Sequence, residues 1–315
     1  MKTKIVVLGG TGFIGHNALA SFASSPDYQV TGTYHEKPPF EIDGVDWIQC
    51  DLTNPNDVER VVSGQQILIQ AAATTSGVKD AITRPDYHVT DNAVMNSLIF
   101  RSAFRNNIEH VIFFSCTNML QSSSSLQSED DFDPRAPMYS KYFGVGWTKV
   151  YLEKMCEFFS MQGSTKFTAI RHSNVYGPWD KFGLENSHVF GATITKVLQS
   201  EGAIKIWGKG EEKRDLLYVS DLVDLMEKVI KSQKVNFELL NAGGNSFISI
   251  KDLTLKIASL ANREITLEYE PSMPTVDFSV QLDNEKAERE YSWIPATSLD
   301  EGIARTINFW NSKFL

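Results

Sequence analysis

The chain has 315 residues, and its 30 basic and 39 acidic side chains give a formal net charge of −9. Such an acidic balance argues against general nucleic-acid binding, which needs a basic surface to neutralise phosphates. Apolar runs such as Ile5 to Leu8 are strand-sized and shorter than the roughly 18 residues of a membrane span, so we expect no membrane partner. The first residues do not have the pattern of a secretory signal, and the cysteines have no metal-like spacing. We therefore expect a cytoplasmic protein without a metal site.

The first predicted elements are a strand, a glycine turn and a helix. An apolar run from Lys4 to Leu8 enters the sequence Gly-Gly-Thr-Gly-Phe-Ile-Gly at 9–15, and a helix-like stretch follows from His16 to Ser24. A strand that feeds a helix in this way leaves free backbone N–H groups at the helix start, where a pyrophosphate can bind. The turn therefore predicts a dinucleotide site, formed by Gly9, Thr11, Gly12, Phe13, Ile14 and Gly15.

Short apolar runs separated by helical stretches continue along the chain, at 29–34, 46–49, 66–70 and 110–115. This pattern predicts an α/β fold with a Rossmann-like, doubly wound parallel sheet. We expect residues 1–170 to form the dinucleotide-binding domain, with a later strand that returns near 211–245. Residues 171–315 should form mainly a smaller, mixed α/β substrate-binding lobe, interleaved with the first domain.

Several strand ends carry further candidates for cofactor binding. Asp51 and Leu52 follow the run at 46–49, where a carboxylate can accept a hydrogen bond from an adenine amine. The small residues Ala71, Ala72 and Ala73 follow the next strand, where they would let the backbone approach a dinucleotide.

The end of the second strand discriminates between the two nicotinamide cofactors. Tyr34 stands where an NAD site usually carries a carboxylate, and His35 and Lys37 are available to a phosphate. This favours NADP(H). NAD(H) stays possible because Glu36 is only a small register shift away.

Longer motifs extend over nearly the whole chain. They are Ser76-Gly-Val-Lys79, Asn174-Val-Tyr-Gly-Pro178, Leu184-Glu-Asn-Ser-His-Val189, Trp207-Gly-Lys-Gly210 and Arg214-Asp-Leu-Leu-Tyr-Val219. With them the chain resembles the extended short-chain dehydrogenase/reductase (NAD-dependent epimerase/dehydratase) family, and within it the GDP-fucose synthase-like branch. The resemblance implies a nicotinamide-dependent oxidoreductase that acts at C4 of a GDP-linked mannose-type sugar, as a 4-keto reductase or 4-dehydrogenase, in surface polysaccharide biosynthesis. It also implies a homodimer.

The resemblance implies a catalytic Tyr-x-x-x-Lys pair on one helix. Lys149 falls on the family lysine, which also binds the nicotinamide ribose, but Val145 falls on the family tyrosine. Valine cannot donate the proton that a sugar alkoxide needs. Tyr142 lies seven residues before Lys149 on the same predicted helix face and is the candidate donor; the alternative is a packing role.

The strand end at Cys116-Thr-Asn118 also departs from the family pattern. The family hydroxyl falls on Cys116 or Thr117, depending on a shift of one residue. Asn118 stands where fucose synthases carry the cysteine that works in epimerisation, while His188 matches its histidine partner. The resemblance therefore implies only half of the epimerisation pair.

The remaining candidates belong to the sugar nucleotide and the nicotinamide. The resemblance implies substrate contacts from Asn118, Asn174, Ser187, His188, Trp207, Arg214 and Asp277. The planar fork of Arg214 suits a diphosphate, and His172 lies close enough in sequence to Asn174 to reach nicotinamide. Because of Val145, an alternative function is a non-catalytic or weakly active regulatory homologue that binds a nucleotide sugar and NAD(P).

Overall fold

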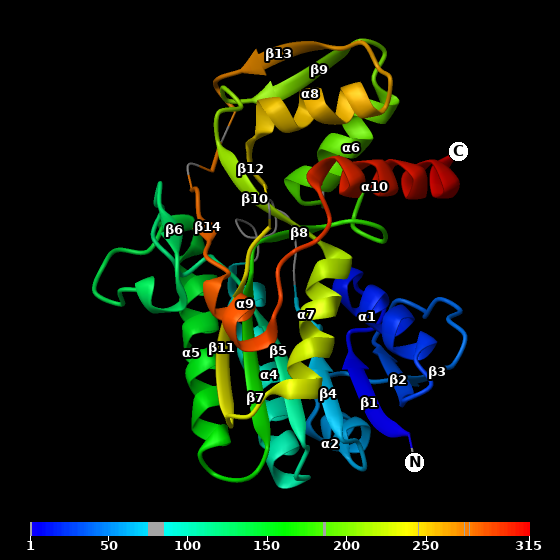
Figure 1. The fold of residues 1–315 in the computed structure, drawn as a ribbon, viewed down its shortest axis with the longest axis vertical. Helices are drawn as coiled ribbons and strands as arrows, with labels where there is room; N and C mark the ends of the chain where they lie inside the picture. Colours follow the sequence, from blue (N-terminus) through cyan, green and yellow to red (C-terminus); the bar gives the residue numbers. More distant parts are fainter. Residues whose placement is uncertain (1, 75–84, 185–186, 245, 274, 277) are drawn as a thin grey trace.

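The structure is a computed structural model that describes residues 2–74, 85–184, 187–244, 246–273, 275–276 and 278–315. Figure 1 shows two parts, a large sheet flanked by helices and a smaller lobe above it. The motif at 76–79, Glu185, Asn186 and the predicted substrate residue Asp277 lie outside the described residues.

The large part is built on a seven-stranded sheet with the order β11-β7-β5-β4-β1-β2-β3, in which every pair is parallel. The prediction of a doubly wound parallel sheet is confirmed. Its strands are β1 (Thr3–Leu8), β2 (Tyr28–Tyr34), β3 (Val45–Gln49), β4 (Ile67–Gln70), β5 (His110–Ser115), β7 (Lys166–His172) and β11 (Phe237–Ala242).

Two hydrophobic cores cover the two faces of this sheet. Along β1, Ile5 and Val7 pack into one core and Val6 and Leu8 into the other, because successive strand side chains point to opposite faces. Helices α1 (Phe13–Ser24), α7 (Val219–Ser232) and α9 (Glu285–Tyr291) contribute to the first core. Helices α2 (Pro55–Val62), α4 (Pro85–Arg105) and α5 (Phe143–Ser160) contribute to the second. Burial on both faces explains why the strands read as continuous apolar runs.

The smaller lobe has its own mixed sheets and core. Strand β10 (Lys213–Tyr218) pairs parallel with β8 (Asn174–Tyr176) and antiparallel with β12 (Ser246–Ser249). A parallel pair, β9 (Ala203–Trp207) with β13 (Thr266–Glu270), lies at the top of Figure 1. Helices α6 (Val189–Gln199), α8 (Ile250–Leu260) and α10 (Leu299–Phe314) share the core of this lobe. Because β11 returns to the large sheet and β10 does not, the two parts interleave.

A projecting segment after β5 connects the two parts beside the large sheet. Its strand β6 (Leu126–Gln127) pairs with β14 (Gln281–Leu282), and two 3-10 turns follow, η1 (Glu129–Asp131) and η2 (Ser140–Tyr142). A small apolar core that includes Met119, Leu120 and Phe278 holds them together. This core places the start of α5 against Val276, Phe278, Val280 and Leu282.

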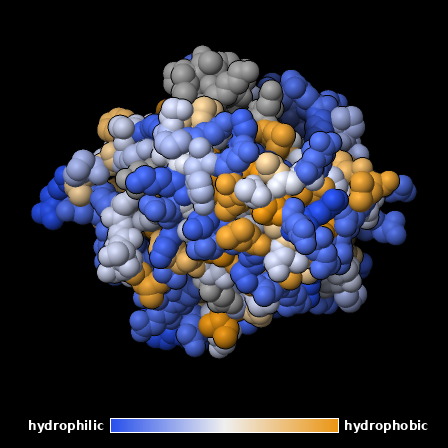
Figure 2. All heavy atoms as spheres, turned by 90° about the horizontal axis from the view of Figure 1, so that it is seen from above, coloured by the Kyte–Doolittle hydropathy of each residue, from blue (hydrophilic) through white to orange (hydrophobic). Residues whose placement is uncertain are grey.

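Hydrophilic side chains cover most of the face seen from above, although hydrophobic side chains gather near its middle (Figure 2). Within the described part of the chain, every helix is too short or too polar to cross a membrane.

Candidate cofactor and sugar-nucleotide site

The glycine turn after β1 is shaped by close backbone contacts. Gly9 has φ +78°, and a Cβ placed there would lie 2.6 Å from the Cα of Ala72. A Cβ on Gly15 would lie 2.2 Å from the carbonyl oxygen of Gly9. Helix α1 begins after Gly12 without a capping side chain, so its first N–H groups are not bonded to a cap. The turn therefore fits the pyrophosphate of a dinucleotide, with Thr11, Phe13 and Ile14 lying along it.

The neighbouring strand ends lie around this turn. The N–H of Gly9 donates to Thr33 Oγ1 at 3.0 Å, which joins the turn to β2. The Ala71 N–H donates to the Leu8 carbonyl at 3.0 Å, so the predicted alanines Ala71 to Ala73 begin directly beside β1. Tyr34 ends β2 with its ring against Trp47, and His35 beyond it is exposed.

Asp51, the predicted contact of the adenine ring, is held in place by hydrogen bonds within its own turn. Asp51 Oδ1 accepts from the backbone N–H of Thr53 at 2.8 Å and from its hydroxyl at 2.7 Å. These hydrogen bonds from Thr53 lower the pKa of Asp51 and keep it an acceptor. Leu52 packs on the second core beside it.

Lys149 lies on α5 at the carboxyl end of β5. Its Nζ donates to the Phe114 carbonyl at 2.7 Å and lies 4.7 Å from the centre of the Phe113 ring. Burial lowers the pKa of Lys149, and the nearby Cys116 and Glu153 act in the opposite direction. The ammonium is thus held against the strand end by contacts that a flexible surface lysine would not have.

An ion pair that the sequence reasoning missed lies one helical turn beyond Lys149. Glu153 Oε2 accepts from Arg171 Nη2 at 2.8 Å, and their side chains are only 6% and 4% exposed. Glu153 Oε1 also accepts from the Ser115 hydroxyl at 2.6 Å. The pair joins α5, β5 and β7 beneath the site, and the spacing of four from Lys149 was the only signal for it in the sequence.

The residues after β5 lie next to Lys149. Cys116 is half-buried, and burial raises the pKa of its thiol while Lys149 and the backbone of Asn118 act to lower it. Thr117 is also half-buried, and its carbonyl accepts from the Leu120 N–H at 3.0 Å. Both candidates for the family hydroxyl position therefore lie at the strand end.

Tyr142 lies outside the helix on which the sequence reasoning had placed it. Helix α5 begins at Phe143, and Tyr142 is the last residue of the 3-10 turn η2. Its ring packs on Phe278 with centroids 5.2 Å apart, and its pKa is raised by burial, with Arg214 acting to lower it. A thiolate at Cys116 would raise the pKa of Tyr142 further. Tyr142 therefore lies in the turn before α5, packed on Phe278, and not one turn along the helix.

Two histidines approach the same end of the sheet. His172 Nδ1 lies 2.7 Å from the Ser173 carbonyl, which can only accept, so we assign the proton to Nδ1 and leave Nε2 as an acceptor. Burial lowers the pKa of His172 to about 4, and Lys149 and His188 act in the same direction. His172 is therefore neutral at pH 7. His188 is the N-cap residue of α6, and its crowded surroundings lower its pKa although its ring keeps solvent exposure.

The predicted substrate residues of the smaller lobe are more dispersed. Arg214 donates from Nη1 to the carbonyls of Lys213 and Phe278, at 2.8 and 3.0 Å, and from Nη2 to that of Val276 at 3.3 Å. Asn174 is exposed and donates to the Asp215 carbonyl at 3.0 Å. Two of the three hydrogen bonds of Arg214 thus go to Val276 and Phe278, in the segment that packs on Tyr142.

Two other predicted residues lie apart from this group. Trp207 is 46% exposed at the end of β9, and the Ser187 hydroxyl donates to the Gly183 carbonyl. The structure brings together Lys149, Cys116, Asn118, Tyr142, His172, His188 and Arg214, whereas the ring of Trp207 lies 6.0 Å from Lys196 Nζ on α6.

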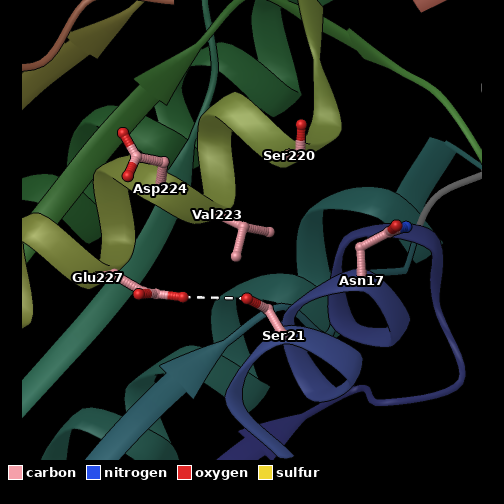
Figure 3. A pocket seen from close by; sticks show the side chains of 6 residues that line it. All are labelled: Asn17, Ser21, Ser220, Val223, Asp224 and Glu227. Carbon is pink, nitrogen blue, oxygen red and sulfur yellow. Dashed lines mark hydrogen bonds between the residues drawn. The ribbon is translucent and has the colours of Figure 1, made fainter. Parts of the chain in front are cut away.

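The cavity in Figure 3 is a separate feature between α1 and α7. Its volume is about 170 Å³, and it is lined by Asn17, Ser21, Ser220, Val223, Asp224 and Glu227. The Ser21 hydroxyl donates across it to Glu227 at 3.0 Å. It contains none of the predicted site residues. Within the described ranges, no group of three His, Cys, Asp or Glu side chains is arranged to hold a metal ion.

Known proteins resemble this chain over nearly its whole length. The chain is 26% identical over 311 residues to a GDP-L-fucose synthase of Sinorhizobium fredii, covering 96% of this chain and 94% of that protein. It is 24% identical to a GDP-L-colitose synthase of Yersinia pseudotuberculosis, covering 98% and 97%. The UDP-glucose 4-epimerase of Thermotoga maritima has the same fold, with a TM-score of 0.88, 21% identity and coverage of 99% and 100%.

The sequence profile of the NAD dependent epimerase/dehydratase family matches residues 5–243, a range that includes the glycine turn, Lys149 and the predicted histidines His35, His172 and His188. The family comprises NAD(P)-dependent enzymes of nucleotide sugars. This chain therefore belongs to the NAD dependent epimerase/dehydratase family.

Proposed function

We propose that this protein is a nicotinamide-dependent oxidoreductase that acts at C4 of a GDP-linked mannose-type sugar, as a 4-keto reductase or 4-dehydrogenase, in surface polysaccharide biosynthesis. The observation that carries the proposal is the convergence of Lys149, Cys116 and Tyr142 at the end of β5, beside a glycine turn that fits a dinucleotide. The GDP-sugar class is supported by the full-length similarity to the fucose and colitose synthases.

A bound nicotinamide would supply the hydride for a sugar ketone, or accept it from the alcohol in the reverse direction. The chain must then hold and move a proton at the sugar oxygen. Tyr142 is the proposed donor because its phenol carries an O–H and lies within the electrostatic influence of both Cys116 and Arg214. The nearby Arg214 favours the phenolate that remains after transfer.

Lys149 is proposed to act in two ways. Its ammonium lies at the strand end where the nicotinamide ribose is expected, and its positive charge stabilises negative charge that develops on the sugar oxygen. The contact with the Phe114 carbonyl fixes its position before a ligand binds. His172, neutral and with Nε2 as an acceptor, is proposed to contact the nicotinamide amide.

The proposed site supports reduction better than double epimerisation. Epimerisation in fucose synthases uses a cysteine and a histidine, and only His188 of that pair matches here, because Asn118 replaces the cysteine. On the nucleotide side, Arg214, Asn174, Ser187 and Trp207 stay proposed contacts of the diphosphate, sugar or base.

The partner and cofactor proposals follow from the same residues. NADP(H) is favoured over NAD(H) because Tyr34 replaces the ribose-binding carboxylate. The homodimer expected from the sequence stays a prediction. The outer side of α5 exposes Phe143, Tyr151 and Phe158, which are 61%, 53% and 53% accessible.

The experiment that tests the activity uses purified protein with GDP-4-keto-6-deoxymannose and either NADPH or NADH, and follows the loss of reduced nicotinamide. We expect turnover with the wild type and a loss of about 10²- to 10⁴-fold in kcat for Lys149→Met and for Tyr142→Phe. Tyr139→Phe is the matched control, since Tyr139 lies beside Tyr142 with centroids 5.4 Å apart and should change kcat by less than about threefold. Unchanged kcat in Tyr142→Phe would assign the proton to another group.

A second candidate function is favoured by Val145, which removes the family proton donor. In this alternative the protein is a regulatory homologue that binds a nucleotide sugar and NAD(P) with little or no turnover. Calorimetric binding of cofactor and GDP-sugar without turnover over hours would support it. Turnover that disappears in Lys149→Met would exclude it.

A further inference from the structure

An aromatic cluster around Trp179 joins the two lobes. The Trp179 ring centre lies 3.9 Å from that of His16 on α1, 4.8 Å from Phe40 in the β2–β3 connection and 5.1 Å from Phe309 on α10. Figure 1 shows the C-terminal end of α10 on the same side of the molecule as α1 and this connection. We call His16, Phe40, Trp179 and Phe309 the aromatic junction. It links the dinucleotide domain to the smaller lobe.

The junction is fixed close to the glycine turn. Trp179 has φ +71°, a left-handed conformation that residues other than glycine rarely adopt, so its packing must hold it there. Asn17 on α1 donates from Nδ2 to the Pro178 carbonyl at 3.0 Å and to that of Phe13 at 2.9 Å. These bonds tie the residue before Trp179 to the first turn of α1. The junction therefore has a defined position relative to the cofactor turn.

Two lysines, one from each lobe, lie over rings of the junction. Lys37 Nζ is 4.6 Å from the centre of the Phe40 ring, and Lys313 Nζ is 4.5 Å from that of Trp179. Burial lowers the pKa of His16 to about 4, and the charges of Lys313 and Lys37 act in the same direction. The two ammonium groups thus converge on one histidine although they lie 276 positions apart in the sequence, from 37 to 313.

This local positive charge is not neutralised within the described part of the chain. None of the ion pairs found there includes Lys37 or Lys313. In a protein with a net charge of −9, two cations that lie over rings of one aromatic cluster, without an acidic partner in these ion pairs, suit an anionic ligand. Ring contacts hold both ammonium groups in place while leaving their N–H donors available.

We propose that Lys37 and Lys313 together bind a phosphate dianion and that this phosphate is the 2′-phosphate of NADP(H). The identity of the ligand rests on the proposed function. Lys37 lies three residues beyond the end of β2, where the adenosine ribose of a dinucleotide binds. His35, the other candidate in this segment, lies instead within the influence of Asp51 and Asp57, which disfavour a phosphate. Lys313 is then a specificity-determining residue that the C-terminal helix supplies to the cofactor site.

The test compares the binding of NADP+ and NAD+ by titration calorimetry at one fixed salt concentration. Lys313→Met and Lys37→Met should each raise the Kd for NADP+ by about 10-fold and change the Kd for NAD+ by less than about twofold. Lys313→Arg should keep most of the preference because it keeps the charge. Lys234→Met, at an exposed lysine after α7, is the matched control and should behave as wild type.

Two further measurements distinguish the 2′-phosphate of NADP+ from a free inorganic phosphate as the ligand of the two lysines. Competition of 2′-AMP with NADP+ in the wild type, weakened in Lys313→Met, supports the cofactor phosphate. Inorganic phosphate that still binds in the presence of saturating NADP+, and raises the unfolding temperature only when Lys313 is present, supports a free phosphate and excludes the cofactor assignment. An NADP+/NAD+ preference that is unchanged in both methionine variants overturns the proposal. If the wild type binds neither dinucleotide, the proposed function fails, and the phosphate arm still decides whether the lysine pair binds an anion.

Discussion

The two ends of the candidate cofactor site are built from different parts of the chain. The pyrophosphate end consists of backbone, and a Cβ at Gly9 or Gly15 would collide with neighbouring backbone atoms. The reactive end consists of side chains, such as Lys149 and Tyr142, whose positions depend on neighbours from several elements. Backbone sites are readable from local sequence, whereas side-chain sites depend on how distant segments pack. The predictions below test this difference, from the largest expected effect to the smallest.

The largest expected effect is the loss of stability when the buried ion pair beneath the reactive end is broken. Arg171→Leu leaves Glu153 charged and buried without its partner, so we expect the free energy of unfolding to fall by about 3 to 5 kcal/mol. Urea titration measures this. Arg289→Leu breaks an exposed pair with Glu290 and should cause no measurable loss.

A double variant tests whether the unpaired charge of Glu153 causes this loss of stability. Replacing both partners, as Arg171→Leu with Glu153→Leu, should recover much of the stability, since no buried charge is then left alone. If the double variant is no more stable than Arg171→Leu, packing and not charge accounts for the loss.

A single methyl group in the glycine turn should weaken dinucleotide binding at the pyrophosphate end. Gly15→Ala places a Cβ against the Gly9 carbonyl at 2.2 Å, and we expect the Kd for a dinucleotide to rise by at least about 100-fold, as measured by calorimetry. Gly64→Ala is the control, because Gly64 also has a positive φ, +75°, but no atom lies within 4 Å of the added methyl group. It should cost some stability and leave binding unchanged. Equal losses in both variants would mean that general destabilisation explains the effect.

Protonation tests the reactive end through His172, which is neutral at pH 7, while the pyrophosphate end has a buried histidine of its own, His16. The pKa of His172 is lowered to about 4 by burial, against about 6.5 in the unfolded chain, so the unfolded state binds more protons between pH 6.5 and 4. This contribution to stability is complete above pH 6.5 and is lost as the pH falls. Relative to His172→Asn, whose amide can replace the Nδ1–H donor, the wild type should lose about 2 kcal/mol between pH 7.5 and pH 5.

Comparison with the variant removes an opposing contribution. Burial raises the pKa of Asp180 and of Asp215 to about 7, which makes stability fall as the pH rises through the same range. Both carboxyls are present in wild type and variant, so their effect cancels in the difference. A stability difference that is independent of pH would show that His172 is not buried as a neutral group.

The sequence by itself determined the parallel sheet, the glycine turn and the position of Lys149, because each depends on local patterns of apolar residues, glycines or helical spacing. The family resemblance also predicts that Val145 stands in place of the catalytic tyrosine. The sequence reasoning placed Tyr142 on the wrong element, since the start of α5 is set by packing of the preceding turn on Phe278, which lies 136 positions away.

Only the tertiary structure brought Glu153 to Arg171, and Lys37 to the same histidine as Lys313. These contacts join segments that are distant in the chain, and no local spacing encodes them. A backbone turn is specified by the residues within it, whereas a cluster of charges between two lobes is specified only when the lobes pack together.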